Sequence, residues 1–87
     1  MTTNHEILER RLKALLDSLG ATLSASERIE VEVFIQAGEY GIALETLCSI
    51  LIEESKGIPE RHLTEIRALG MSMELDPDTW AGVASSS

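Results

Sequence analysis

The sequence predicts an all-α fold, a compact bundle of four helices plus a short C-terminal helical turn in a single domain over residues 1–87. Apolar residues recur at helical spacing in four segments, and start signals of threonine, serine or proline precede three of them. With 44% apolar and 25% charged residues, the composition is that of an ordinary globular domain. The end of the chain, residues 84–87, has the small polar composition of a frayed tail.

The first helix is predicted over residues 4–19. Thr3 and Glu6 fit a capping box, and Gly20 can supply a left-handed stop. Between them the apolar residues follow a spacing of three and four: Ile7, Leu8, Leu12, Leu15, Leu16 and Leu19.

The second helix is predicted from a capping box at Ser24 and Glu27 to Ala37-Gly38. Its apolar stripe consists of Val31, Phe34 and Ile35. The run from residue 29 to residue 33 also alternates as a strand would. A helix is preferred because the chain has no second strand candidate for this segment to pair with.

The third helix is predicted from Glu39 to about Ser55, before Gly57. At 100° per residue, one face gathers Tyr40, Leu44, Leu47, Cys48 and Leu51, and the opposite face gathers Glu39, Ile42, Thr46, Ser49 and Glu53, with Ile50 and Glu45 at its margins. Gly41 either lets another helix approach closely or only loosens the first turn, and we favour the packing role.

Pro59, which follows Ile58, opens the fourth helix. Its inner stripe consists of Leu63, Ile66, Leu69 and Met73, and Gly70 is expected to end or bend it. Asp76 and Pro77 then signal a short final turn, which should press Trp80 and Val83 onto the bundle.

Negative charge is concentrated in the middle of the chain. Of the net charge of −8, residues 27–54 contribute 1 − 7 = −6, from Arg28 against seven glutamates. Such acidity repels phosphate backbones, which argues against direct nucleic-acid binding, and it favours a basic partner surface. No segment reaches the roughly 20 apolar residues of a membrane span and no signal peptide is evident, so a cytoplasmic location and no membrane contact are expected.

The sequence offers no catalytic set, metal site or cofactor motif, and an enzyme is not expected. His5 and His62 fall on different helices, and His62 is expected to be exposed rather than a ligand. The turn at Gly38-Glu39-Tyr40-Gly41 lacks the Gly-Lys-Ser/Thr ending of a phosphate loop and is interpreted as a helix corner. Cys48, the one cysteine, is expected to be a buried, unreactive thiol.

The outward face of the third helix is the candidate partner-binding site. Ile42 and Ile50 would be exposed there within a rim of carboxylates, as in a protein interface. The alternative is that another segment, such as the first helix, covers them. The candidate residues are Glu39, Ile42, Glu45, Ile50, Glu53 and Glu54.

One part of the chain resembles a known family. Phe34-Ile35, the run Gly38-Glu39-Tyr40-Gly41-Ile42-Ala43-Leu44-Glu45, and Leu47-Cys48 closely resemble the central motif of the Maf-type immunity proteins. The resemblance implies a non-catalytic, all-helical bacterial inhibitor that neutralises the toxic C-terminal domain of a cognate polymorphic toxin. The toxic domain would be a protein partner with a basic cleft, often a nuclease. The competing hypothesis is a small structural or regulatory helical protein that self-associates as a homodimer through the same face.

Overall fold

The computed structural model describes residues 4–86 and confirms the all-α class. Four α-helices of at least twelve residues precede a short fifth helix, with a 3-10 turn after the first. Their bounds are α1 Asn4–Leu19, the 3-10 turn Gly20–Thr22, α2 Ala25–Gln36, α3 Tyr40–Glu53, α4 Glu60–Ser72 and α5 Asp78–Ala81. Within the described residues the only strand-like pairing is one isolated bridge, so the alternating run 29–33 is helical.

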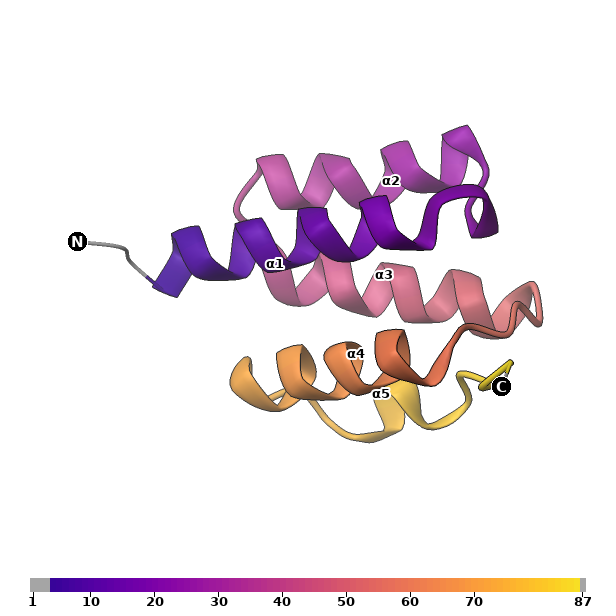
Figure 1. Ribbon diagram of the computed structural model, residues 1–87. Helices are drawn as coiled ribbons and strands as arrows, with labels where there is room; N and C mark the ends of the chain where they lie inside the picture. Colours follow the sequence, from indigo (N-terminus) through magenta and orange to yellow (C-terminus); the bar gives the residue numbers. More distant parts are fainter. Residues whose placement is uncertain (1–3, 87) are drawn as a thin grey trace.

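The helix α3 is the centre of the bundle. It packs against α1, α2, α4 and α5, and α2 lies beside it after a tight corner (Figure 1). This position explains why α3 is the most apolar helix, since it must bury side chains against several neighbours at once. Its predicted inner face is confirmed: Leu44, Leu47, Cys48 and Leu51 are fully buried, and Tyr40 is half-buried.

The ends of α2 form as the sequence predicts. The backbone N–H of Glu27 donates to the Ser24 hydroxyl at 3.1 Å, and the backbone N–H of Ser24 donates to the Glu27 carboxylate at 2.9 Å. At the other end Gly38 has a φ of +78°, which lets the chain turn directly into α3. Thr3, the cap expected for α1, lies outside the described residues. The helix α3 ends at Glu53, two residues before the predicted end at about Ser55, and Ser55 adopts a positive φ of +52°.

Contrary to the expectation from the sequence, Gly70 does not end α4, which continues to Ser72. It lies inside the helix, and a Cβ atom there would sit 2.1 Å from Cζ3 of Trp80. Because Gly70 has no side chain, the indole of Trp80 in α5 can pack directly against α4 at this point. Trp80 and Val83 are both buried, as predicted. Gly41 has ordinary space instead, because a Cβ atom would lie 3.5 Å from a methyl group of Leu75, so it permits no unusually close helix approach.

The C-terminal residues 84–86 are held to the bundle, which corrects the expectation of a frayed tail over residues 84–87. The N–H of Ile58 donates to the carbonyl of Ala84 at 3.0 Å, and the N–H of Ser86 donates to the carbonyl of Ile58 at 2.8 Å. These bonds make a single parallel bridge between the connection before α4 and the end of the chain. The two backbone hydrogen bonds compensate for the conformational entropy that residues 84–86 lose when they become ordered. Ser87 lies outside the described residues.

Candidate functional site

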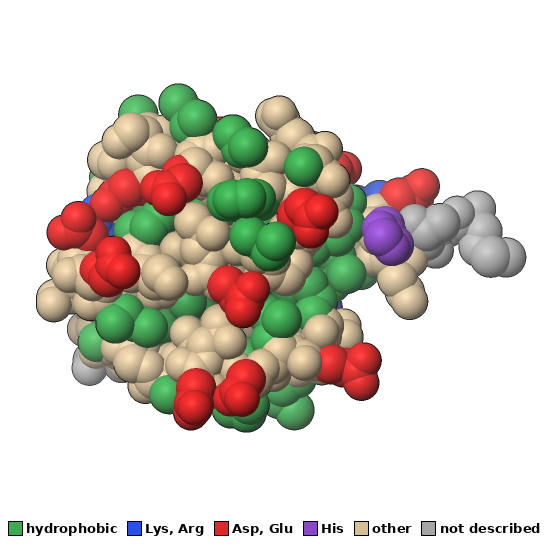
Figure 2. Space-filling view, turned by 180° about the vertical axis from the view of Figure 1, so that it is seen from behind, with side chains coloured by type: hydrophobic (Ala, Val, Ile, Leu, Met, Phe, Trp, Pro, Cys, Tyr) green, Lys and Arg blue, Asp and Glu red, His purple; other side chains and the backbone are tan. Residues whose placement is uncertain are grey.

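A groove runs between α2 and α3 on the side of the molecule shown in Figure 2. It has a volume of about 520 Å³, and five of its eight lining residues are glutamates. We call it the acidic groove; its residues are Glu27, Glu30, Glu45, Thr46, Ser49, Ile50, Glu53 and Glu54. Figure 2 shows acidic side chains around apolar ones on this face, with basic side chains visible only near its edges.

Helical spacing explains how both helices contribute to the acidic groove. Glu27 and Glu30 are three residues apart on α2, and Glu45, Ser49 and Glu53 recur every four residues on α3. Residues at such intervals lie on one side of a helix. The sequence prediction included the α3 carboxylates and missed the two from α2. The spacing of Glu27 and Glu30 is visible in the sequence, but which neighbour they face is set by the packing of the helices.

One carboxylate of the acidic groove is neutralised inside the molecule. The Lys56 ammonium lies 2.9 Å from Oε1 of Glu27, and the backbone N–H of Ser24 donates to the same oxygen. The pKa of the Glu27 carboxyl is lowered, mainly by the hydrogen bond from Lys56 and secondly by the hydrogen bond from the backbone of Ser24. Glu27 is thus part of the scaffold, because its charge is already committed to holding the start of α2 against the connection after α3.

The other four glutamates of the groove have no basic partner among residues 4–86. The ion pairs in this range involve Arg11, Lys13, Arg28, Lys56 and Arg67, and none of them reaches Glu30, Glu45, Glu53 or Glu54. All four carboxylates are on exposed residues. Their repulsion is tolerated because water screens them, and a basic surface would relieve it.

Ile50 is not an exposed anchor, and here the prediction was wrong. Its side chain is only 8% exposed, because it lies between α3 and α2 at the base of the acidic groove. Ile42 is 42% exposed, as predicted. The other predicted contact residues, Glu39, Glu45, Glu53 and Glu54, are also exposed, but Glu39 and Ile42 lie outside the acidic groove, towards the corner between the helices.

Apolar side chains lie beside the acidic groove along α2 and at that corner. Phe34 is four residues beyond Glu30, and Ile42 is seven residues before Ser49, so both continue the sides of the helices that line the groove. On the crest of α2, Ile29 is 58% exposed and Val33 is 55% exposed. We call these four residues, Ile29, Val33, Phe34 and Ile42, the apolar patch. The sequence reasoning missed its α2 members, and the alternation with glutamates could not have revealed them, because Val31 alternates in the same way and is fully buried.

The remaining reactive groups do not form a site. His62 is 8% exposed, so the expectation that it lies on the surface was wrong; the first turn of α4 packs it against the bundle. No group of three or more metal-ligating side chains occurs among the described residues. Burial, with the nearby Glu45 carboxylate as a smaller cause, raises the pKa of the Cys48 thiol to about 12.

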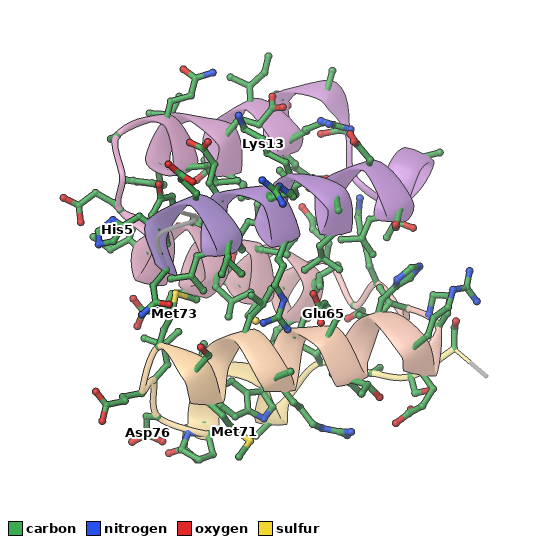
Figure 3. The ribbon with its side chains drawn as sticks, turned by 60° about the vertical axis from the view of Figure 1, so that its left-hand side comes forward. His5, Lys13, Glu65, Met71, Met73 and Asp76 are labelled. Atoms are coloured by element: carbon green, nitrogen blue, oxygen red, sulfur yellow. The ribbon has the colours of Figure 1, made fainter. Side chains whose placement is uncertain are left out.

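A second, smaller hollow lies between α1 and the end of α4. It measures about 180 Å³ and is lined by Asn4, Ile7, Leu8, Arg11, Ser72 and Met73. Its one charged lining residue is Arg11, whose guanidinium is held by both oxygens of Glu65 at 3.0 and 2.8 Å. Figure 3 shows Glu65 directed from α4 towards α1. Because the charge of Arg11 is already paired with Glu65, this hollow is a weaker candidate for a binding site than the acidic groove.

Comparisons with protein-family models, curated proteins and solved structures each give no match for this chain. Among the helices described for residues 4–86, none has both the length and the apolar composition needed to cross a bilayer.

Proposed function

We propose that this chain is an immunity protein that binds the toxic C-terminal domain of a cognate polymorphic toxin and neutralises it without catalysis of its own. The observation that carries the proposal is the acidic groove beside the apolar patch. Four of its carboxylates have no basic partner among the described residues. The resemblance of residues 34–48 to the Maf-type immunity motif supports it.

A toxin that acts on nucleic acid needs a basic cleft, and an acidic surface is complementary to such a cleft. Complementary charge speeds association above the neutral range of about 10⁵ to 10⁶ M⁻¹s⁻¹. Protection also requires tight binding, and a nanomolar complex corresponds to about −12 kcal/mol. Exposed charges do not supply that much, so the proposed interface includes the apolar patch as its anchor.

The proposed contact surface therefore extends over two helices. From α3 and the residues that flank it, the surface keeps the exposed residues Glu39, Ile42, Glu45, Glu53 and Glu54. Ile50 instead supports the groove from below, and α2 adds Glu30 with the rest of the apolar patch.

The alternative function, self-association of a regulatory protein through this face, is less favoured on physical grounds. A symmetric dimer would bring two copies of the acidic groove together. Like charges in contact oppose association unless each meets a cation, and the described bases are mostly engaged elsewhere. Sedimentation at several protein concentrations distinguishes the two functions, because the proposed inhibitor stays monomeric when it is alone.

Co-expression tests the proposed function directly. The proposal expects the gene immediately upstream to encode a large secreted protein, and the variable C-terminal domain of that protein is the toxin to test. The domain alone should arrest growth, and this chain should restore growth. Continued arrest with the chain present at an equal level contradicts the proposal.

Association kinetics with the purified toxin domain then test the surface. The double variant Glu39→Lys with Glu53→Lys should associate more slowly at low salt, while its far-UV circular dichroism stays unchanged. The matched control is Glu9→Lys with Glu74→Lys, which changes net charge equally at exposed or half-exposed sites outside the groove. Equal slowing by both pairs would mean that only net charge matters and that the proposed surface is not the contact.

A further inference from the structure

We propose that two copies of this chain can exchange their C-terminal segments, so that residues 75–86 of each copy pack against α3 and α4 of the other. We call residues 75–86 the strap. The proposal goes beyond the proposed function and does not depend on it, because none of the residues that line the acidic groove belongs to the strap. It rests on how the strap is held and on the backbone of the turn that connects the strap to α4.

The strap is a continuous segment with few anchors. In Figure 1 it runs back beneath α4, from the end of that helix towards its start. Its helix α5 has only four residues. Trp80 and Val83 are its buried side chains, and Leu75 packs partly buried against the core. A terminal segment of this kind can open locally while the helices that precede it stay folded.

The sites that receive the strap lie in the rest of the chain. Trp80 packs against Gly70 of α4. The N–H of Ile58 donates to the carbonyl of Ala84 at 3.0 Å, and the carbonyl of Ile58 accepts from the N–H of Ser86 at 2.8 Å. These sites do not depend on which chain the strap belongs to. The strap of a second copy therefore makes the same contacts with them, and it is the occupant that the structure shows to fit.

The turn between α4 and the strap contains backbone strain. Glu74 has a φ of +58°, in the left-handed region that is unfavourable for a residue with a side chain. Its N–H donates to the carbonyl of Met71 at 3.1 Å, which closes the turn. When the strap leaves its own bundle, residues 73–77 extend and Glu74 returns to a negative φ. A short hinge under strain favours exchange between copies, and Pro77 adds to this because it biases Asp76 towards an extended backbone.

Ion pairs outside the strap hold the remaining helices together when the strap is open. Arg11 of α1 donates to both carboxylate oxygens of Glu65 in α4, at 3.0 and 2.8 Å. Lys56, after α3, lies 2.9 Å from Oε1 of Glu27 in α2. Opening therefore breaks only the contacts of the strap, and the exchanged dimer forms all of them again. The remaining cost is the freedom that two chains lose on association, so the dilute protein stays monomeric and exchange requires a high concentration.

Refolding at different protein concentrations tests the exchange with the full chain. The protein is unfolded in urea and refolded in dilute or in concentrated solution, and sedimentation then measures the fraction of dimer. We expect this fraction to rise with the concentration at which the chain refolds. Monomer alone at every refolding concentration would overturn the proposal.

Two glycine substitutions test the hinge. Glu74→Gly lets the turn adopt its positive φ without strain, so the equilibrium constant for dimerisation should fall by about tenfold. The matched control is Ser55→Gly, which removes the same kind of strain at a φ of +52° but lies outside the hinge, and it should leave dimerisation unchanged. Equal effects of the two substitutions, or no effect of Glu74→Gly, would show that the turn does not drive exchange.

A disulfide identifies which copy holds each strap. A Cβ atom at residue 57 would lie 3.2 Å from Cβ of Ser86, close to the roughly 3.5–4.5 Å of a disulfide. The variant Gly57→Cys with Ser86→Cys should link a monomeric chain to itself, and should link the two chains of an exchanged dimer to each other. On a non-reducing gel the isolated dimer should therefore run as a dimer. A dimer that separates there into internally cross-linked single chains associates through another surface, and this result would reject the exchange.

Discussion

Replacing Gly70 with alanine should destabilise the protein, although alanine is the better helix former. The new Cβ atom would lie 2.1 Å from Cζ3, 2.7 Å from Cε3 and 2.8 Å from Cη2 of Trp80. Carbon atoms in contact prefer about 3.5 Å or more, so the indole must move by about 1.4 Å. The indole is a rigid ring packed in the core, so the clash cannot be relieved by moving only the end of a flexible side chain.

The expected net change follows from two opposing terms. Overpacking in a core costs about 1–3 kcal/mol, and a contact this short belongs at the upper end. Replacing glycine with alanine inside a helix stabilises the helix by about 1 kcal/mol. The free energy of unfolding should therefore fall by about 2 kcal/mol, which lowers the Tm of a domain of this size by about 8–16 °C.

Urea unfolding followed by far-UV circular dichroism measures the loss, and the fluorescence of Trp80, the single tryptophan, reports the displacement. The native emission of the variant should shift towards that of an indole in water. The matched control is Gly41→Ala, also in a helix, where the added carbon meets Leu75 at 3.5 Å and should be neutral or slightly stabilising. A Gly70→Ala protein as stable as the natural one, with unchanged emission, would refute the role of Gly70 as the seat for Trp80.

Three further predictions concern stability and reactivity. Arg11 lowers the pKa of Glu65 by hydrogen bonding, so this stabilisation is present above the ordinary carboxyl pKa and is lost as pH falls through the lowered value. Glu65→Gln should cost about 0.5–1 kcal/mol at pH 7, the range for a partly exposed pair, and the difference from the natural protein should disappear in acid urea titrations; a constant difference would contradict the pairing. Ser24→Ala removes the capping box and should cost about 1 kcal/mol, whereas Ser24→Gly should cost only a few tenths; an alanine variant as stable as the natural protein would show that the hydroxyl is not the cap. Cys48, with its pKa raised to about 12, should react with a thiol reagent only at the rate of unfolding, and a fast reaction in the native state would disprove its burial.

The candidate site could be predicted in part because the spacing of charged residues along the sequence shows which side of a helix they occupy. Glu45, Glu53 and Ile42 fall on the outward side of α3 at any plausible helix position, and all three are exposed. Ile50 lies at the margin of that side, where a rotation of one residue decides burial. Its burial, at 8% exposed, depends on how the helices pack together, and a helical projection of one segment contains no neighbour.

By itself the sequence determined the helices, the capping box of α2 and the burial of most of the apolar stripes, because capping, turn conformation and periodicity are local properties of a few consecutive residues. Only the tertiary structure decided which side chains from different helices meet. In the tertiary structure Trp80 packs against Gly70, residues 84–86 are hydrogen-bonded to Ile58, and Glu30 of α2 lines the same groove as the carboxylates of α3. The physical reason is that these contacts depend on the rotation and distance of packed helices, which the whole core sets at once.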